Sequence, residues 1–398
     1  MKMLTLDKVF NAQTVLKNII RETNVVRAYG IAPDCELYLK PENLQITGSF
    51  KVRGSAYKIA MLSEQEKAKG VIACSAGNHA QGVALAATKN GIKSLICLPD
   101  TAPISKVEAT KGYGAEVCLV EGYYDDAYKK ALELRDSEGY TFVHPFDDEN
   151  VIAGQGTIAL EILNDLDNID AIVVPIGGGG LISGIAYTVK QIRPSVKVYG
   201  VQAAGAPSMY NSVKDREIEC LPSVSTIADG IAVKQPGENT FHYVSDYVDE
   251  IALVTDDEVA SAILALIEKQ KMIAEGAGAT AVAAVMTNKF NLKGKRVVAV
   301  VSGGNIDVTS LSRVIDRGLL NSGRSSSLLI ELIDKPGQLK EISRIIADCG
   351  GNVTGVHYEK GNTESVNGCF LRIEMETRDF EHVNLITKSL RDEGFKLV

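Results

Sequence analysis

The stretch AIVVPIGGGGLISG, from Ala171 to Gly184, joins an apolar run, four consecutive glycines and the start of a helical pattern. Such an apolar run predicts a strand of a parallel sheet that is buried on both faces. The glycines weaken regular structure, but together they let backbone N–H groups wrap an anion at a helix start. We therefore favour a phosphate-binding loop over a bare turn. The spacing matches neither G-x-G-x-x-G nor a P-loop, which disfavours a nicotinamide dehydrogenase.

The same rhythm of apolar run, Gly or Ser turn and amphipathic helix repeats from Gly70 to Asp316. It predicts an open α/β architecture in which ligands bind at the carboxyl ends of the strands. Further strands are expected at Val71–Cys74, Ser94–Leu98, Glu116–Val120, Lys197–Val201 and Arg296–Val301. Helices are expected at Asn78–Asn90, Asp125–Glu138, Ala153–Asn164, Leu181–Ile192 and Asp256–Ile273.

The pattern changes near Gly318. The segment NSGRSSS, residues 321–327, has the composition of a flexible linker. Beyond it the order of predicted elements is β-α-β-β-α-β, a ferredoxin-like module over residues 328–398. Its strands are expected at Leu328–Ile333, Asn352–Glu359, Cys369–Glu376 and Phe395–Val398, and its helices at Gln338–Asp348 and Phe380–Asp392.

Composition narrows the functional classes. The 398 residues carry a formal net charge of −8, which argues against a nucleic-acid binder. No apolar run is long enough to span a membrane, and the start of the chain lacks a secretory signal, so we expect a cytoplasmic location. The seven cysteines include no C-x-x-C pair and the five histidines are scattered, which predicts reduced core thiols and no zinc site.

Three further segments could carry chemistry. In Ser49–Gly54 (SFKVRG), Lys51 has apolar and cationic neighbours that would lower its pKa and make it a nucleophile toward an aldehyde. Ser75–Gly82 (SAGNHAQG) opens a helix and could receive a carboxylate, or Ser75 or Asn78 could simply cap that helix. Val301–Asn305 (VSGGN) ends a strand, so its hydroxyl either faces the ligand crevice or belongs to a glycine turn.

Together the four segments, S-F-K-x-R-G, S-A-G-N-H-A-Q-G, G-G-G-G-L and S-G-G-N, resemble the tryptophan-synthase-like (fold type II) family of pyridoxal-phosphate enzymes, and within it the threonine dehydratases. The resemblance covers nearly all of residues 1–318. It implies a two-subdomain catalytic domain over residues 1–320, with a small subdomain at about 45–150. It also implies that Lys51 holds the cofactor aldehyde, Phe50 packs beside the ring, Asn78 binds the ring hydroxyl and Ser302 meets the ring nitrogen.

By the same resemblance, the cofactor phosphate is held by Gly177, Gly178, Gly179, Gly180 and Leu181. The substrate carboxylate is received by Ser75, Ala76, Gly77 and Asn78, and Lys51 and Ser75 are the catalytic residues. The implied reaction converts L-threonine to 2-oxobutanoate and ammonia, with L-serine to pyruvate as a side activity. This places the chain in threonine catabolism or in isoleucine biosynthesis.

Two departures from related sequences matter. Serine racemases, which are similar to this chain, carry a serine where Ala76 stands. Alanine cannot donate a proton, so the resemblance favours dehydration over racemisation. Those relatives also hold a divalent cation with acidic residues near Gln202 and Ser208, and both carboxylates are missing here. We predict no such metal site, although backbone carbonyls could hold a monovalent cation.

The C-terminal module resembles the ACT domain, an amino-acid-sensing fold, through its first loop DKPGQL, Asp334–Leu339. A single module resembles the catabolic subgroup and implies an allosteric enzyme that responds to isoleucine or valine. AMP is the other effector that the resemblance allows, with contacts near Thr47, Gln81 and Asn305. It also implies a homodimer or homotetramer.

Two alternatives stay open. One is a serine-preferring dehydratase, because the two substrates differ by one methyl group, worth only about 1–3 kcal/mol of discrimination. The other is a catalytically silent amino-acid sensor, in which the large domain is a scaffold for the C-terminal module.

Overall fold

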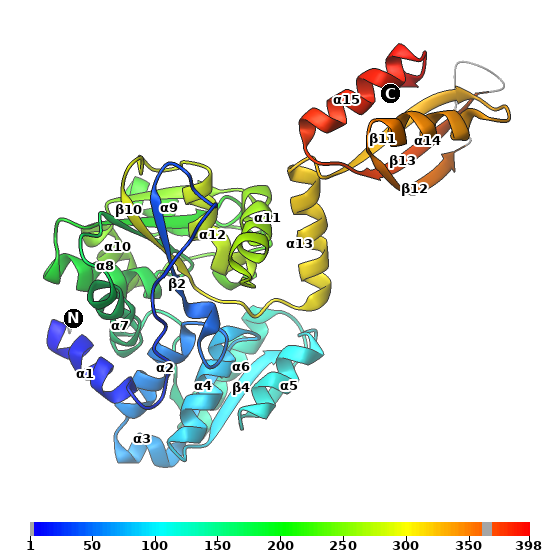
Figure 1. Cartoon of the computed structure of the whole chain (residues 1–398). Helices are drawn as coiled ribbons and strands as arrows, with labels where there is room; N and C mark the ends of the chain where they lie inside the picture. Colours follow the sequence, from blue (N-terminus) through cyan, green and yellow to red (C-terminus); the bar gives the residue numbers. More distant parts are fainter. Residues whose placement is uncertain (1–3, 360–367) are drawn as a thin grey trace. The chain divides into compact units, whose positions relative to one another are not determined.

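The computed structural model describes residues 4–359 and 368–398. The chain divides into two compact units, residues 1–308 and 309–398, which are described separately below (Figure 1). Within the described residues, no helix is long and apolar enough to cross a membrane.

The larger sheet of the first unit has the strand order β1-β2-β10-β7-β8-β9. Only β1 is antiparallel to its neighbour, and the other strands run parallel. The central strands β7 and β10 are almost entirely buried, as continuous apolar runs predict. The strands are β1 (Val26–Arg27), β2 (Glu36–Pro41), β7 (Ala171–Pro175), β8 (Lys197–Ala203), β9 (Glu250–Val254) and β10 (Arg296–Val301).

A second sheet of four parallel strands has the order β5-β4-β3-β6. The two sheets confirm the predicted α/β class with two open, mostly parallel sheets. The strands are β3 (Val71–Cys74), β4 (Ser94–Pro99), β5 (Glu116–Val120) and β6 (Thr141–Phe142). The helices of this part are α2 (Lys51–Ala60), α3 (Glu64–Lys69), α4 (Asn78–Lys89), α5 (Ile104–Gly112) and α6 (Tyr124–Glu138); Figure 1 draws α4, α5 and α6 around β4.

The remaining helices of the first unit mostly belong to the part of the chain that forms the larger sheet. They are α1 (Leu6–Leu16), η1 (Glu42–Leu44), α7 (Glu149–Asp165), α8 (Gly180–Ile192), α9 (Ser208–Asp215), η2 (Asp229–Ile231), α10 (Glu238–Tyr247), α11 (Asp256–Ala265), η3 (Leu266–Gln270) and α12 (Gly276–Met286). The helix expected over Asp256–Ile273 differs in its second half. It is α-helical to Ala265 and continues as one π-helical turn that ends at Lys271 in the left-handed conformation.

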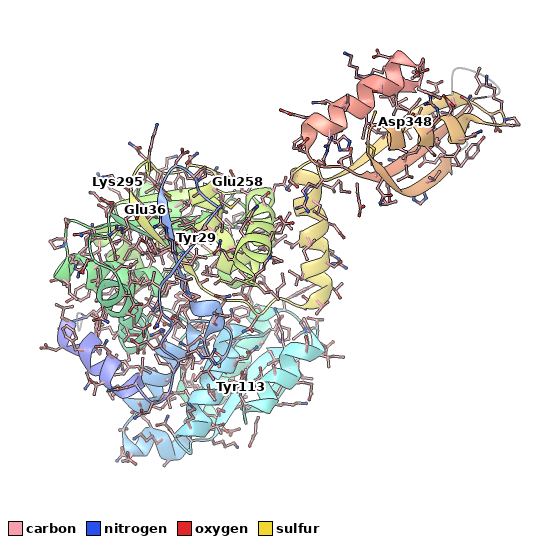
Figure 2. The ribbon with its side chains drawn as sticks, in the orientation of Figure 1. Tyr29, Glu36, Tyr113, Glu258, Lys295 and Asp348 are labelled. Carbon is pink, nitrogen blue, oxygen red and sulfur yellow. The ribbon has the colours of Figure 1, made fainter. Side chains whose placement is uncertain are left out.

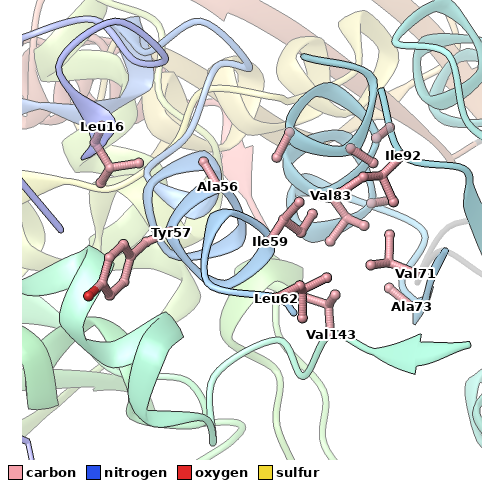
Figure 3. Close-up of a cluster of buried hydrophobic side chains, with 14 of the residues drawn as sticks. Leu16, Ala56, Tyr57, Ile59, Leu62, Val71, Ala73, Val83, Ile92 and Val143 are labelled. Atoms are coloured by element: carbon pink, nitrogen blue, oxygen red, sulfur yellow. The ribbon is translucent and has the colours of Figure 1, made fainter. Parts of the chain in front are cut away.

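One apolar cluster holds α2 against α4 and the second sheet. Ile59 and Leu62 from the α2 side, Val83 from α4 and Val71 from β3 belong to this buried cluster, and Figure 3 shows their side chains gathered between the helices. Gly82 allows the close approach, because a Cβ atom there would lie only 3.1 Å from the backbone nitrogen of Val52. The packing therefore fixes the start of α2 beside α4.

A buried ionic network ties the same helix to the larger sheet. Arg53 is fully buried and makes two hydrogen bonds each to the carboxylates of Glu42 in η1 and Glu161 in α7. Lys40, at the end of β2, pairs with Glu161 at 2.5 Å and with the carbonyl oxygen of Thr23. Two cations thus face two carboxylates, so the buried charges balance.

Charged side chains also lie at the surface of the first unit, where Figure 2 labels Glu36, Glu258 and Lys295. Glu36 pairs with Arg296, and Glu258 pairs with Lys289. Such partly exposed pairs contribute little to stability because water and salt screen them.

The second unit is a ferredoxin-like module with the strand order β12-β13-β11-β14, all neighbours antiparallel. Its apolar core lies between this sheet and two helices, with Ile342 and Ile346 from α14 and Ile386 from α15. The elements are α13 (Val308–Asn321), β11 (Ser325–Ile333), α14 (Gln338–Asp348), β12 (Asn352–Glu359), β13 (Gly368–Glu376), α15 (Phe380–Asp392) and β14 (Lys396–Leu397).

The structure differs from the expected linker over residues 321–327. Helix α13 runs to Asn321 and strand β11 already begins at Ser325, so only three residues separate them. The three serines belong to the strand because their backbone pairs with residues 374–376 of β13. Pairing with the backbone of β13 therefore decides the structure of residues 325–327, although their Gly/Ser-rich composition predicts a linker.

Replacing Arg53 by methionine should lower the free energy of unfolding by about 3–5 kcal/mol, because two buried carboxylates lose their main partner. Urea unfolding followed by circular dichroism measures this. Arg135→Met, at an exposed Arg135–Asp136 pair, is the matched control and should unfold like the wild type. Equal stability of the two variants would contradict the importance of the network.

Candidate active site

Lys51 is the first residue of α2 and lies beside the segment that joins β6 to α7. Its Nζ donates a hydrogen bond to the carbonyl oxygen of Pro145 at 2.8 Å and lies 5.3 Å from the centre of the Phe50 ring. Burial lowers the pKa of this amine to about 8, and the negative charge of Glu275 opposes the shift. Since an ordinary lysine has a pKa of about 10.5, much more of this amine is neutral near pH 7, as a nucleophile requires.

The segment before Lys51 runs antiparallel to the residues after β10. Ser49 and Gly303 form a β-bridge, and the backbone N–H of Phe50 donates to the carbonyl oxygen of Ser302 at 3.1 Å. Ser302 is buried, and the one hydrogen bond that the described structure shows for its Oγ is long, 3.4 Å to the carbonyl oxygen of Ala277. The strand end thus brings Ser302 next to Phe50 and Lys51.

The loop Ser75–Asn78 leads from β3 into α4. No side chain caps this helix, so neither Ser75 nor Asn78 acts as the cap that the sequence left open. Ser75 Oγ instead accepts the backbone N–H of Gly77 at 3.2 Å. A Cβ atom at Gly77 would meet nothing within 4 Å. The loop therefore offers open space at a helix start, where backbone N–H groups favour an anion.

The four glycines form a tight loop between β7 and α8. Gly179 has a φ of +96°, which favours glycine, and a Cβ atom at Gly178 would lie 2.5 Å from the ring of Phe146. The hydroxyl of Thr240 in α10 donates to the carbonyl oxygen of Gly178 at 2.6 Å. The loop thus turns its backbone at the start of α8, as a phosphate cradle requires.

The segment His144–Asp147 connects Lys51 with this loop. Pro145 accepts the hydrogen bond from Lys51, and Phe146 packs on Gly178 and Gly180. His144 Nδ1 accepts the backbone N–H of Asp147 at 2.7 Å, which makes a tight turn. Asp147 in turn accepts the backbone N–H groups of residues 239 and 240 at the start of α10.

Glu275 closes the other side of the site. Its Oε1 accepts a hydrogen bond of 2.6 Å from Asn78 Nδ2, and its carboxylate is buried. Burial, followed by the charge of Asp229, raises the pKa of Glu275 to about 7. The neighbouring Asn305 donates through Nδ2 to Asn78 Oδ1 at 2.8 Å and to the carbonyl oxygen of Thr47 at 2.7 Å.

The structure therefore brings most of the expected residues together. Phe50, Lys51 and Ser302 are linked through backbone bonds, Lys51 reaches the glycine loop through Pro145 and Phe146, and Asn78 is joined to the 302–305 segment. Leu181 lies buried just inside α8. Sequence reasoning missed Pro145, Phe146, Thr240 and Glu275. The glycine loop hinted at Phe146 and Thr240 only, because its bare Cα atoms require neighbours that fill the space.

Gln202 and Ser208, where relatives of similar sequence were expected to hold a cation, are both buried. Gln202 Oε1 accepts the backbone N–H of Tyr210, and its Nε2 has no partner in the described structure. An amide N–H donor is a poor neighbour for a cation. Among residues 4–359 and 368–398, no cluster of three or more His, Cys, Asp or Glu side chains is arranged to hold a metal ion.

These residues fit a ligand that carries an aldehyde at one end and a phosphate at the other. A lysine amine with a lowered pKa suits the aldehyde, and the glycine loop, which has no side chains and leads into a helix start, suits the phosphate.

Comparison with known proteins agrees with this fit. The family described as "Pyridoxal-phosphate dependent enzyme" matches residues 16–303. A protein of Thermotoga maritima named "L-threonine ammonia-lyase" is 48% identical, and the match covers 99% of both chains. A protein of Staphylococcus aureus (strain N315) named "L-threonine dehydratase catabolic TdcB" is 47% identical over 79% of this chain and 93% of its own length.

A solved structure is also similar. It is described as the processed form of threonine deaminase isoform 2 from Solanum lycopersicum. It matches with a TM-score of 0.76 and 37% identity over 79% of this chain and 90% of that chain.

The burial of His79 predicts how the free energy of unfolding of the full chain, without ligand, depends on pH. It is buried, its Nε2 lies 2.8 Å from the carbonyl oxygen of Val143, and burial lowers its pKa from 6.5 to about 3. Between these two values the unfolded chain binds the extra proton, so stability present above pH 6.5 is lost as the pH falls. His79→Gln should remove about 1.4 kcal/mol per pH unit from this slope.

Urea unfolding at a series of pH values measures the effect. Above about pH 7 both proteins carry a neutral side chain at this position, so their stability curves should run parallel there. Parallel curves below pH 6 as well would contradict a buried neutral His79.

Proposed function

Because the chain belongs to the family of pyridoxal-phosphate-dependent enzymes, we propose that it converts L-threonine to 2-oxobutanoate and ammonia: water is eliminated first, and one water molecule is taken up again when ammonia is released. L-serine, converted to pyruvate, is the side activity. The observation that carries the proposal is Lys51, whose amine has a pKa lowered to about 8 and donates to Pro145, the neighbour of the Phe146 that packs on the glycine loop. The names of the Thermotoga and Staphylococcus relatives support L-threonine as the substrate.

Five parts of the site would hold the cofactor. Lys51 would bind its aldehyde, residues 177–181 its phosphate, Asn78 its ring hydroxyl and Ser302 its ring nitrogen, while Phe50 packs beside the ring. When bound, pyridoxal phosphate supplies an electron sink for negative charge at the substrate α-carbon. The long hydrogen bond of Ser302 leaves its hydroxyl able to turn toward a ligand. A neutral hydroxyl at this position does not favour ring protonation as a carboxylate would.

Lys51 then carries the proton chemistry. With the substrate bound, the free amine of Lys51 would take the α-proton as a general base. A pKa near 8 suits this role because the neutral base is present at physiological pH and still holds a proton well. The backbone at Ser75–Asn78 binds the substrate carboxylate, where Gly77 leaves room for it.

Ala76 favours elimination over racemisation. It lies in the carboxylate loop and has no group that could deliver a proton to the substrate. A serine-preferring dehydratase remains the alternative enzyme. A silent sensor is disfavoured, because a purely structural scaffold needs no lysine with a lowered pKa beside a glycine cradle.

We assign catalysis to the first unit and regulation to the second. The second unit has a cavity of about 210 Å³ between β11, the start of α14 and the neighbouring strands. Leu332, Val356 and Leu371 line it with apolar groups, and Asp334 and Lys335 add one charge of each sign. An aliphatic amino acid such as isoleucine or valine has matching chemistry, with an apolar side chain, an ammonium and a carboxylate.

AMP finds less support as the effector. Thr47 and Gln81, the expected contacts, are buried in the single chain, and Asn305 already donates to the carbonyl oxygen of Thr47. A homo-oligomer remains our expectation, and so does a cytoplasmic location.

Lys51→Ala should abolish the visible absorption of the bound cofactor and nearly all turnover of L-threonine, because both the covalent link and the base are lost. Absorbance spectra and 2-oxobutanoate formation measure the two effects. Lys58→Ala, on the same helix but paired with Asp148, is the control and should keep the absorption band.

Turnover by Lys51→Ala at the wild-type rate would contradict the assigned role. A higher kcat/KM for L-serine than for L-threonine in the wild type would favour the serine-preferring enzyme. A purified wild type without a visible band after addition of pyridoxal phosphate would favour the silent sensor.

Isoleucine or valine should bind the full chain and change the kcat/KM for L-threonine. Asp334→Asn should weaken this binding about tenfold or more, because the effector ammonium loses its partner, worth about 1.4 kcal/mol. Asp348→Asn, on α14 at a surface pair with Arg344, should bind like the wild type. Calorimetry measures binding, and a response to AMP alone would contradict the amino-acid site.

A further inference from the structure

Glu275 is a buried carboxylate that has no part in the roles proposed so far. It stands at the position before α12, yet its side chain does not cap that helix. Only 6% of the residue is exposed, and among the described residues no cationic side chain forms an ion pair with it. A buried charge without an ion pair is costly, and such groups cluster at functional sites.

The surrounding backbone leaves room for this carboxylate. A Cβ atom at Gly303 would lie 2.4 Å from Glu275 Oε1, and one at Gly230 would lie 3.4 Å from it. The backbone N–H of Glu275 also donates to the carbonyl oxygen of Gly303 at 3.0 Å. The carboxylate is thus held directly beside the residue that follows Ser302.

The hydrogen bonds of Asn78 show what Glu275 does. An asparagine amide has two N–H donors and one carbonyl acceptor. Glu275 accepts one N–H of the Asn78 amide, and an N–H of Asn305 donates to the Asn78 carbonyl oxygen. The other N–H of Asn305 donates to the carbonyl oxygen of Thr47, which fixes the Asn305 side chain. The amide cannot turn over without losing both bonds, so its second N–H is the group left for a ligand.

We propose that Glu275 is a positioning residue for the reaction: its carboxylate orients the Asn78 amide so that an N–H, and not the carbonyl oxygen, faces the ring hydroxyl oxygen of the cofactor. The inference rests on the proposed function, since it needs Asn78 to contact the cofactor. The carbonyl oxygen of a turned amide would meet the ring oxygen as a second acceptor and would repel it.

Glu275 also acts on Lys51 through its charge. The groups that face it are Asp229 of η2, Lys106 of α5, Lys51 of α2 and the amide of Asn78. Its pKa of about 7 and that of Lys51 of about 8 lie close together, and its negative charge favours the protonated lysine. Removing this charge should therefore make Lys51 release its proton at lower pH.

Two variants separate orientation from charge. Glu275→Gln keeps an oxygen that can accept from Asn78 but carries no charge, whereas Glu275→Ala removes both. The full chain is stripped of cofactor and titrated with pyridoxal phosphate, and absorbance gives the dissociation constant and the uptake rate as a function of pH. Glu250→Gln, at an exposed position of β9, is the matched control.

We expect Glu275→Ala to bind the cofactor at least about tenfold more weakly and to lose about 100-fold in kcat for L-threonine. KM should change little, because the ring is misplaced while the backbone of the Ser75–Asn78 loop is unchanged. Glu275→Gln should restore the affinity to within about threefold. Its uptake rate should reach a plateau at lower pH than in the wild type.

Asp229→Asn is a further variant at an exposed position and leaves the site residues in place. Removing its charge should make Glu275 ionise at lower pH, which favours protonated Lys51 and moves the uptake midpoint upward. Wild-type affinity in Glu275→Ala, or unchanged uptake profiles in both Glu275→Gln and Asp229→Asn, would overturn the inference. Failure of the wild type to consume L-threonine would instead overturn the proposed function, and the binding measurements would still decide the role of Glu275.

Discussion

The paired charges of Arg53, Lys40, Glu42 and Glu161 are the constraint on which the site depends. These side chains come from α2, the end of β2, η1 and α7, and they meet in a buried position. A buried pair that loses one partner leaves an uncompensated charge, so the four segments tolerate little displacement. Because Arg53 is two residues after Lys51, the network holds the start of α2 at the place where β2 ends and η1 begins. The Lys51 amine, which we propose to react, is thus held in place by a network of buried charges two residues further along the chain.

Glycines provide the second constraint, since they allow contacts that side chains would block. Gly303 leaves room for Glu275, Gly178 receives the ring of Phe146, and Gly82 lets α2 approach α4. Each contact joins one of the four motifs to a residue outside it. The motifs are therefore parts of one packing arrangement. Lys51 donates to Pro145, and the next residue, Phe146, packs on the glycine loop. Glu275 accepts a hydrogen bond from Asn78 and interacts with Lys51 through its charge. The chemistry of the site follows from this, because burial both lowers the pKa of the lysine and raises that of the glutamate.

The elements that the sequence predicted well have strong local signals. Strands β3, β5 and β10 and helices α14 and α15 have the expected bounds, because buried apolar runs and amphipathic repeats depend only on neighbouring residues. The short strands β1 and β6 and the edge strand β9 were not predicted, since their pairing comes from distant partners. The linker predicted over residues 321–327 was wrong for the same reason. Ser325–Ser327 form a strand because their backbone pairs with the distant strand β13.

The sequence by itself determined the α/β class, the ferredoxin-like tail, the family and the identity of Lys51, the tetraglycine loop and Ser302 as candidates. These properties depend on residue types at short spacing, where local sterics and burial patterns act. The tertiary structure alone decided which side chains surround these residues, above all Pro145, Phe146 and Glu275, and how far the pKa values of Lys51 and Glu275 move. Desolvation and charge depend on distances through space, and residues such as Asn78 and Glu275, 197 positions apart, meet only when the chain has folded.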